Sequence, residues 1–324
     1  MIDVRSPAEY AHAHIPGAVN IPLFDDHERA RVGTRYKQVG RDSAVLLGLE
    51  LVGPKLALFV RQASRLKPES GEVLVHCWRG GMRSGSFAWL LETAGMRVST
   101  LVGGYKAYRN EVLTAFQQPR TLFVLGGKTG SAKTETLHEL ARLGEQVIDL
   151  EALAHHKGSS YGMIGQPVQP SSEQFQNTLH RTWIALEAAR PIWLEDESKA
   201  IGSCFIPDGL WHQMRQAPVA LLDVPVSERI RFLVNGYGQF PHEALVEATD
   251  RIRKRLGNDR HQAAMQALEE RDYARVVELT LGYYDKAYLF GLSQRAAEQI
   301  HVFPFPALNP AQAARDVRAW ARQC

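Results

Sequence analysis

The sequence predicts an α/β protein of two domains, the first over residues 1–118 and the second over residues 119–324. In both parts short apolar runs alternate with helical patterns, and this alternation favours parallel sheets with helices on their faces. At roughly 150 residues per domain, the length of 324 residues fits two domains. The polar, helix-breaking residues 117–119 mark the boundary between them.

In the first domain we expect a buried strand at 72–76, a helix at 84–94, a strand at 97–101 and a helix through 108–116. The helix at 84–94 shows the clearest pattern, because Phe87, Leu90, Leu91 and Ala94 recur at helical spacing. These elements predict a small α/β domain with a parallel sheet.

In the second domain we expect strands at 121–125, 147–150, 192–195 and 219–224. A helix carries Leu137 and Leu140, and a long amphipathic helix covers 173–189. From residue 227 onward the pattern is mostly helical. The prediction is therefore a P-loop-like α/β domain with a helical C-terminal part.

Composition restricts the class of protein. Hydrophobic residues make up 45% and charged residues 23%, which excludes a disordered chain. No apolar run approaches the roughly 18 residues of a membrane span, and the charged start is unlike a signal peptide, so we expect a cytoplasmic protein without a membrane partner. The net charge of +3 permits a polyanionic partner without requiring one.

The cysteines Cys77, Cys204 and Cys324 lie far apart, which argues against a disulfide framework and against a zinc site. Cys77 alone is followed by a loop rich in glycine and arginine that leads into a helix. Loop N–H groups and a helix N-terminus stabilise a thiolate, so Cys77 is the candidate nucleophile. The blander alternative is a buried structural cysteine. The candidate cradle for a chalcogen or phosphate comprises Arg79, Gly80, Gly81, Arg83 and Ser84.

This part of the chain resembles the rhodanese family. The strings DVRSPAEY at 3–10, HIPGAVN at 14–20 and VGGY at 102–105 are similar to its flanking motifs and follow in the same order. The resemblance implies that the cysteine carries a chalcogen as a persulfide-type intermediate. Two departures are an alanine, Ala13, where glycine is usual, and a start at the DVR strand, from which we expect an incomplete sheet edge.

Five residues separate Cys77 from Arg83. In ordinary sulfurtransferases the corresponding loop is one residue shorter, whereas the longer loop of this chain is similar to that of rhodanese-fold phosphatases. A wider ring of N–H groups suits a tetrahedral phosphate. We therefore expect a substrate such as selenophosphate or a phosphoester rather than thiosulfate.

Residues 127–134 read GKTGSAKT between a predicted strand and a predicted helix, which is the context of a P-loop. Backbone N–H groups would surround a diphosphate, with a lysine to neutralise it and a threonine for Mg²⁺. The departure is an alanine at 132, and the blander alternative is a chance turn. Acids at the end of the predicted strand 192–195 are candidates for binding the metal ion. The predicted diphosphate-binding residues are Gly127, Thr129, Gly130, Ser131, Ala132, Lys133 and Thr134, and the metal-side acids are Glu195 and Glu197.

A basic run is the candidate tRNA-binding surface, through phosphate neutralisation. A solvated helix face is the alternative. Tyr283 and Tyr284 can stack on a base or pack in the core. The basic residues are Arg251, Arg253, Lys254, Arg255 and Arg260.

Taken over nearly the whole chain, the motifs resemble the tRNA 2-selenouridine synthase family, in particular CWRGGMRS at 77–84, GKTGSAKT at 127–134 and YYD at 283–285. The resemblance implies an enzyme that converts wobble 2-thiouridine of tRNA to 2-selenouridine. It implies S-geranylation from geranyl diphosphate, then selenium transfer from selenophosphate, with no tightly bound cofactor. Two other interpretations stay open: a sulfurtransferase or cysteine-dependent phosphatase fused to an ATPase, and a non-enzymatic nucleotide-sensing RNA binder.

Overall fold

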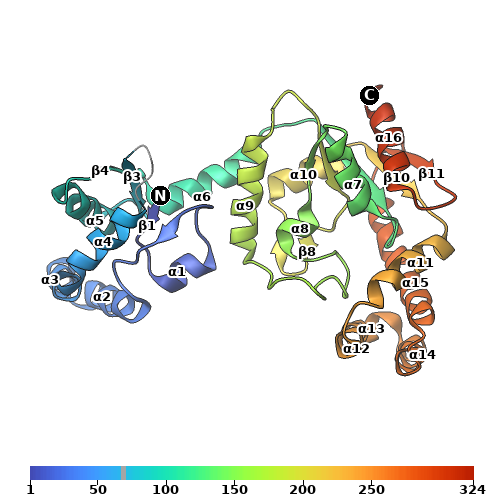
Figure 1. The fold of residues 1–324 in the computed structure, drawn as a ribbon, viewed down its shortest axis with the longest axis horizontal. Helices are drawn as coiled ribbons and strands as arrows, with labels where there is room; N and C mark the ends of the chain where they lie inside the picture. Colours follow the sequence, from blue (N-terminus) through green and yellow to red (C-terminus); the bar gives the residue numbers. More distant parts are fainter. Residues whose placement is uncertain (67–70) are drawn as a thin grey trace. The chain divides into compact units, whose positions relative to one another are not determined.

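The computed structural model describes residues 1–66 and 71–324, which divide into two compact units, Met1–Ala115 and Phe116–Cys324 (Figure 1). The α/β class expected from the sequence is confirmed. The division falls just before Phe116, whose ring packs on Trp183 of its own unit at a centroid distance of 5.4 Å.

The first unit is built on a parallel sheet in the order β2-β1-β3-β4. Its strands are β1 (Ile2–Asp3), β2 (Val19–Asn20), β3 (Glu72–His76) and β4 (Arg97–Thr100). The strand that begins the chain is not the sheet edge, because β2 pairs outside it. The central strand β3 ends at the cysteine loop, and Val75, Phe87 and Leu91 are buried beside it.

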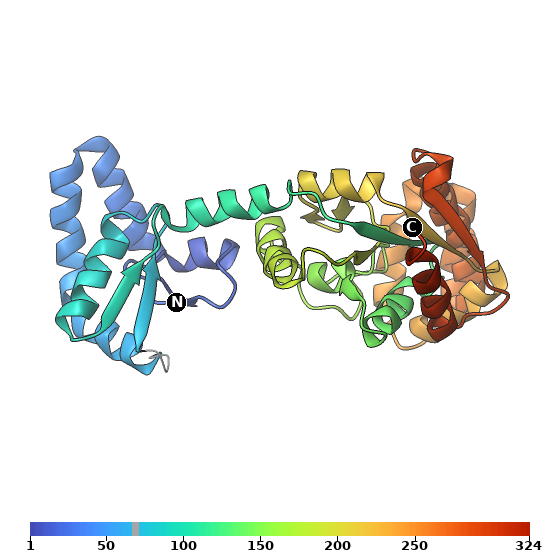
Figure 2. The same cartoon turned by 90° about the horizontal axis from the view of Figure 1, so that it is seen from above.

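The helices of this unit are α1 (Pro7–His12), α2 (Asp26–Gln38), α3 (Arg41–Val52), the 3₁₀ turn η1 (Gly53–Lys55), α4 (Leu56–Arg65), α5 (Met82–Thr93) and α6 (Gly104–Ala115). Capping explains the start of α2, where the Asp25 side chain accepts the N–H of Glu28. The hairpin of α2 and α3, which the sequence patterns did not single out, packs side by side in blue in Figure 2.

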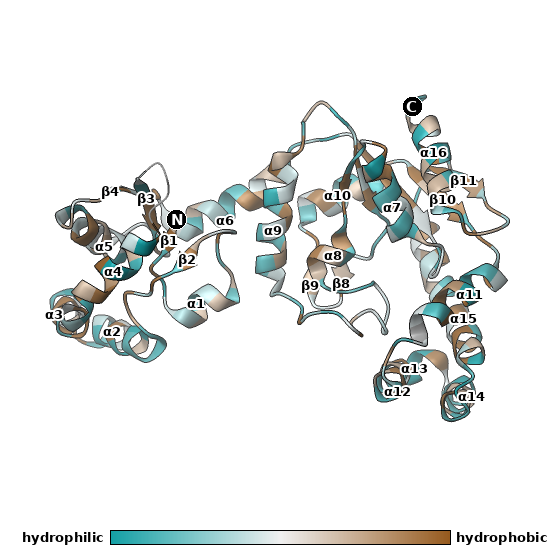
Figure 3. Cartoon of the chain, viewed as in Figure 1, coloured by the Kyte–Doolittle hydropathy of each residue, from teal (hydrophilic) through white to brown (hydrophobic). Residues whose placement is uncertain are grey.

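One helical run departs from the composition argument. Taken together, Arg41–Arg65 is long and apolar enough by length and composition to cross a membrane (Figure 3). An 18-residue stretch of it has a mean hydropathy of 1.7, and 17% of that stretch is buried. A single run of this kind is weak evidence for a membrane span. The 3₁₀ turn containing Pro54 also interrupts it, because proline removes a backbone donor.

The second unit is built on a parallel sheet in the order β11-β10-β5-β7-β6. Its strands are β5 (Leu122–Gly127), β6 (Gln146–Ile148), β7 (Ile192–Glu195), β10 (Val219–Asp223) and β11 (Ile300–Pro304), with a separate pair β8 (Ala200–Ile201) and β9 (Cys204–Phe205). The fully buried β5 lies between β10 and β7 and ends at the predicted phosphate loop. The strand β11 was missed, since it is a short segment that follows a long helical region.

The helices of this unit are α7 (Lys133–Arg142), α8 (Leu150–Ala154), α9 (Ser172–Ala185), α10 (Asp208–Gln216), α11 (Val226–Tyr237), α12 (His242–Arg251), α13 (Arg253–Leu256), α14 (Asn258–Glu269), α15 (Tyr273–Leu292), η2 (Ala297–Gln299) and α16 (Pro310–Ala321). The amphipathic helix expected to reach residue 189 ends at Ala185. As expected, the region after residue 227 is mostly helical, and Leu245, Val276 and Leu281 belong to a core cluster of its own.

Candidate functional site

The first candidate site lies where β3 ends and α5 begins. Cys77 is 3% exposed, while the loop residues after it are exposed. Two backbone hydrogen bonds from α6 hold the start of this loop: Tyr105 N–H donates to the Cys77 carbonyl and Lys106 N–H to the Trp78 carbonyl, each at 2.9 Å. The loop is therefore fixed from one side and open to solvent on the other.

The glycines at this loop differ in whether a side chain would fit at their positions. Gly80 has a φ of +66°, and a Cβ there would lie 2.7 Å from the Leu101 carbonyl oxygen. Gly104, at a φ of +61°, sits against the Cys77 carbonyl, where a Cβ would overlap it. At Gly81 a Cβ would meet nothing within 4 Å. The tight crossing therefore depends on Gly80 and Gly104, and Gly81 is not needed for it.

The cradle stabilises a thiolate at Cys77. The Ser84 hydroxyl lies 3.2 Å from Sγ, and the backbone N–H groups of Ser84, Arg79 and Gly81 also face the sulfur. Burial on its own raises the pKa of the Cys77 thiol, but these hydrogen bonds together outweigh it, so the pKa lies below its ordinary value. By contrast, burial raises the pKa of Cys204 to about 11.

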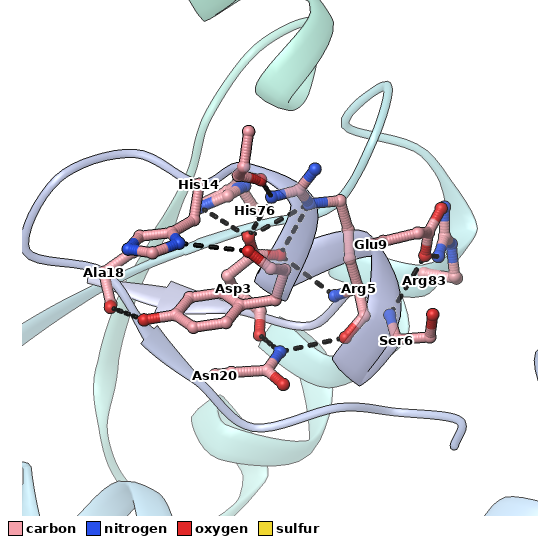
Figure 4. A network of polar contacts seen from close by, with 11 residues as sticks. Asp3, Arg5, Ser6, Glu9, His14, Ala18, Asn20, His76 and Arg83 are labelled. Carbon is pink, nitrogen blue, oxygen red and sulfur yellow. Dashed lines mark hydrogen bonds and ion pairs between the residues drawn. The ribbon is translucent and has the colours of Figure 1, made fainter. Parts of the chain in front are cut away.

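The two arginines of the loop act differently. Arg83 Nη1 donates to Glu9 Oε2 at 2.8 Å, and the same carboxylate oxygen accepts the N–H of Ser6 at the start of α1 (Figure 4). Burial raises the pKa of Glu9, but Arg83 outweighs that effect and the net pKa is lowered. Arg83, expected to face the substrate, thus braces the loop against α1. Arg79 contributes its backbone N–H, and its side chain is exposed.

The flanking motifs form a buried network beneath the loop (Figure 4). Arg5 donates to the Asp3 carboxylate at 2.6 Å and to the Ala13 carbonyl at 2.7 Å, and Asn20 donates to the carbonyls of Asp3 and Arg5. The departure at Ala13 is harmless, because its φ of −166° is extended backbone that any residue adopts. These residues support the loop and do not reach the sulfur.

The second candidate site lies between β5 and α7. Lys133 Nζ donates to the Gly127 carbonyl at 3.0 Å, and the Thr134 hydroxyl donates to Glu151 Oε2 at 3.1 Å. Ser131 Oγ is buried and has no hydrogen-bond partner. Ala132 adopts a left-handed conformation, with φ 57° and ψ 40°, directly before the helix. The departure from glycine therefore falls at a position where an L side chain is strained.

A cavity of about 1160 Å³ opens at this loop. Its lining combines phosphate-loop residues and acidic side chains with aromatic and apolar side chains, several of them from α10, α11 and α15. The lining includes Glu151, Glu197, Trp211, Phe232, Phe240 and Tyr284. The cavity therefore offers both polar groups and apolar surface to a ligand.

Of the two acids predicted for the metal ion, only one lines the cavity. Glu195 is fully buried and lies outside the cavity lining, with Oε2 accepting the N–H of Leu150 at 3.0 Å. Glu197 does line the cavity, hydrogen-bonded to Glu151. Burial, and then the charge of Glu151, raise the pKa of Glu197 to about 8. Glu151 was missed as a site residue, although it follows a predicted strand beside Asp149, which was a usable signal.

Helix α15 holds the phosphate loop, which sequence reasoning also missed. The Tyr288 hydroxyl accepts the Gly127 N–H at 2.8 Å and donates to Asp196 at 3.0 Å. Asp196 in turn accepts a hydrogen bond from the buried Arg295 at 2.8 Å. One chain of hydrogen bonds thus joins the loop to the C-terminal helices.

A second connection runs through the YYD string. Asp285 accepts two hydrogen bonds from the buried Arg229, at 2.9 and 2.7 Å, and Arg229 also donates to the Thr129 carbonyl in the phosphate loop. The Tyr284 hydroxyl accepts the N–H of Ser160 at 3.2 Å. Tyr284 packs against the core cluster that includes Leu245 and Val276, and Asp285 and Tyr284 also position two loops of the cavity.

The basic run spans three helices and not one. Arg251 ends α12, the next basic residues form α13, and Arg260 lies in α14. All five predicted side chains are exposed. Within residues 1–66 and 71–324, no group of three or more His, Cys, Asp or Glu residues is placed to hold a metal ion by itself.

Fold and loops together define a two-domain protein, in which a rhodanese-like domain precedes a P-loop domain. Residues 1–111 match the family model of the rhodanese-like domain, and residues 120–304 match that of the tRNA 2-selenouridine synthase AAA domain. The chain belongs to the tRNA 2-selenouridine synthase family.

Curated relatives match along most of their length. The tRNA 2-selenouridine synthase of Bordetella bronchiseptica is 36% identical, covering 92% of this chain and 89% of its own, and that of Marinobacter nauticus is 34% identical with the same coverage. A crystal structure titled as the N-terminal domain of a putative ATP/GTP binding protein from Clostridium difficile 630 is 46% identical. It covers 35% of this chain and 87% of its own, with a TM-score of 0.34.

Proposed function

We propose that this protein is an enzyme that replaces the sulfur of 2-thiouridine in tRNA by selenium. The names of the relatives, at 34–36% identity over 92% of the chain, support the overall reaction. The two loops support a division of labour, since one stabilises a nucleophilic sulfur and the other is shaped for a diphosphate. A tRNA substrate is consistent with action in the cytoplasm.

In the proposed first step the phosphate loop binds geranyl diphosphate. The thiouridine sulfur attacks the geranyl C1, the C–O bond breaks, pyrophosphate leaves, and the N3 proton is lost. Loop N–H groups and Lys133 stabilise the developing charge on the diphosphate. The buried, unpartnered Ser131 hydroxyl fits a loop that is completed by an anion.

The donor set also fits Mg²⁺, which prefers hydroxyl, carboxylate and phosphate oxygens. Thr134, Glu151 and Glu197 are the residues that would hold it. When bound, the ion would neutralise charge on the leaving diphosphate. The hydrogen bond between the side chains of Glu151 and Glu197 places the two carboxyl groups next to each other, which supports this assignment.

In the proposed second step Cys77 acts. S-alkylation has turned C2 of the base into an electrophilic carbon with a thiol leaving group. The Cys77 thiolate attacks the phosphorus of selenophosphate, the P–Se bond breaks, and hydrogen selenide leaves, after which water hydrolyses the S–P bond and releases phosphate. The selenide attacks C2 of the base, the C2–S bond breaks, and geranyl thiol leaves. The observation that carries this step is the ring of N–H and hydroxyl donors around a buried sulfur.

The test is mass spectrometry of tRNA nucleosides from cells with and without the gene. We expect 2-selenouridine to disappear on deletion, with 2-thiouridine in its place. With purified protein, the geranylation and selenation half-reactions are then measured separately. Release of phosphate without any tRNA or selenium would favour a phosphatase joined to an ATPase, and nucleotide-dependent RNA binding without turnover would favour an RNA sensor.

A further inference from the structure

An exposed indole ring stands beside the buried sulfur. Trp78 is 37% exposed, although it directly follows Cys77, which is 3% exposed. Trp78 begins the exposed part of the loop that follows the sulfur.

The ring is held from behind. It packs on the Tyr105 ring at a centroid distance of 5.6 Å, and Tyr105 is fully buried. On Tyr105 the Arg5 guanidinium lies 3.8 Å from the ring centroid. The Trp78 carbonyl accepts the Lys106 N–H, so the backbone is fixed as well. Arg5, Tyr105 and Trp78 thus form an ordered stack that ends in an accessible aromatic surface.

Positive charge borders this surface. Arg79 follows Trp78 in the chain, and Lys106 is joined to it through the backbone. Both side chains are exposed. An aromatic face flanked by cations is the arrangement that binds single-stranded nucleic acid, because bases stack on the ring and phosphates pair with the cations.

We propose that Trp78 is the stacking platform that positions the target uracil of the RNA loop at Cys77. The proposal rests on the proposed role of Cys77 as the nucleophile that releases selenium from selenophosphate. Stacking fixes the plane of the base and leaves its C2 to approach the sulfur from the loop's open side. Trp78 is on this view a binding and positioning residue for the base.

The first experiment uses photochemical crosslinking. An RNA stem-loop with 5-iodouridine at the target position is irradiated with the full-length protein, and the crosslinked peptide is mapped by mass spectrometry. We expect the crosslink at Trp78, in the native protein and in Cys77→Ser alike. A crosslink on other residues, with none at Trp78, overturns the proposal.

The second experiment compares variants in the selenation of pre-geranylated RNA. Since stacking contributes about 1–3 kcal/mol per base, Trp78→Ala should raise the KM for RNA about 5- to 150-fold, while Trp78→Phe stays within a few-fold of the native value. Trp89→Ala is the matched control, because Trp89 is 63% exposed on α5 of the same unit. Alkylation of Cys77 should be unchanged in all three.

Two other outcomes contradict the proposal, and a third separates it from the proposed role of Cys77. Equal losses in Trp78→Phe and Trp78→Ala, with slowed Cys77 alkylation, would show that the ring only supports the loop. Equal effects of Trp78→Ala and Trp89→Ala would indicate an apolar docking face for a protein. If Cys77→Ser retains 2-selenouridine formation while the crosslink still maps to Trp78, the proposed role of Cys77 fails and the base platform stands.

Discussion

The two strand-to-helix loops of this chain differ in where their negative charge comes from. The loop at 77–84 surrounds an anion that belongs to the chain, the Cys77 thiolate, and its donors are satisfied by that sulfur. The loop at 127–134 surrounds no side-chain anion. It leaves the Ser131 hydroxyl buried without a partner and turns Lys133 onto a backbone carbonyl. The first loop directs its donors at a sulfur of the chain itself, while the second loop keeps a buried hydroxyl without a partner.

The largest effect is expected from a substitution that removes the thiolate of the first loop. Cys77→Ser should abolish selenium transfer, because a serine hydroxyl does not ionise near neutral pH and is too weak a nucleophile to attack selenophosphate. Cys204→Ser and Cys324→Ser are the controls and should keep the activity. Full 2-selenouridine formation by Cys77→Ser, measured by nucleoside mass spectrometry, would contradict the comparison.

Next in size is the loss of the cation in the second loop. Lys133→Ala should block geranylation and weaken the binding of inorganic pyrophosphate, because the charge on the diphosphate is no longer neutralised. Selenation of pre-geranylated tRNA should survive better, since the cysteine loop lies in the other unit. Calorimetry with pyrophosphate and the two half-reactions measure this. Equal loss in both half-reactions would mean that the loops do not act separately.

A smaller effect is expected at the basic surface. If Arg253 and Arg255 neutralise tRNA phosphates, log affinity falls with log salt by roughly 0.7 to 0.9 per contact. Replacing both by alanine should weaken tRNA binding and flatten that slope by about one to two units. Filter binding over a salt series measures it, with Cys77 alkylation as the control. An unchanged slope would show a solvated surface.

The cradle itself can be weakened without removing the sulfur. Ser84→Ala deletes the hydroxyl 3.2 Å from Sγ, so the pKa of Cys77 should rise and its pH profile of alkylation should shift to higher pH. Native Cys77 should react faster than Cys324 at slightly acidic pH, and the variant should lose part of that advantage. A profile that does not move would mean that the backbone N–H groups alone set the pKa.

The smallest expected effect concerns backbone strain. Ala132 has a φ of 57°, where glycine is preferred, whereas the cysteine loop already uses glycine at its own left-handed position, Gly80. Ala132→Gly should therefore stabilise the second unit by about 1 kcal/mol. Urea unfolding followed by circular dichroism measures this. A lower midpoint of unfolding would show that the entropy gained by the unfolded chain exceeds the strain relieved.

The sequence predicted what local patterns encode and missed what distant residues share. Both loops were found because each follows an apolar strand and opens a helix, which is a contiguous signal. Glu151, Arg229 and Tyr288 were missed as members of the phosphate site, since they reach it from elements far apart in the chain. The same reason explains Arg83, whose pairing with Glu9 across 74 residues could not be read from the loop.

The spacing of contacts along α15 has a thermodynamic consequence. This helix touches the phosphate loop through Tyr288 and, by way of Asp285 and Arg229, at Thr129. The same helix packs against α13 and α14, which carry Arg253, Arg255 and Arg260. A ligand that reorders the loop acts on the element that supports the basic residues. If the basic residues bind a polyanion, occupancy of the cavity and affinity for that polyanion should be linked, and linkage is reciprocal: whatever factor the first contributes to the second, the second returns to the first.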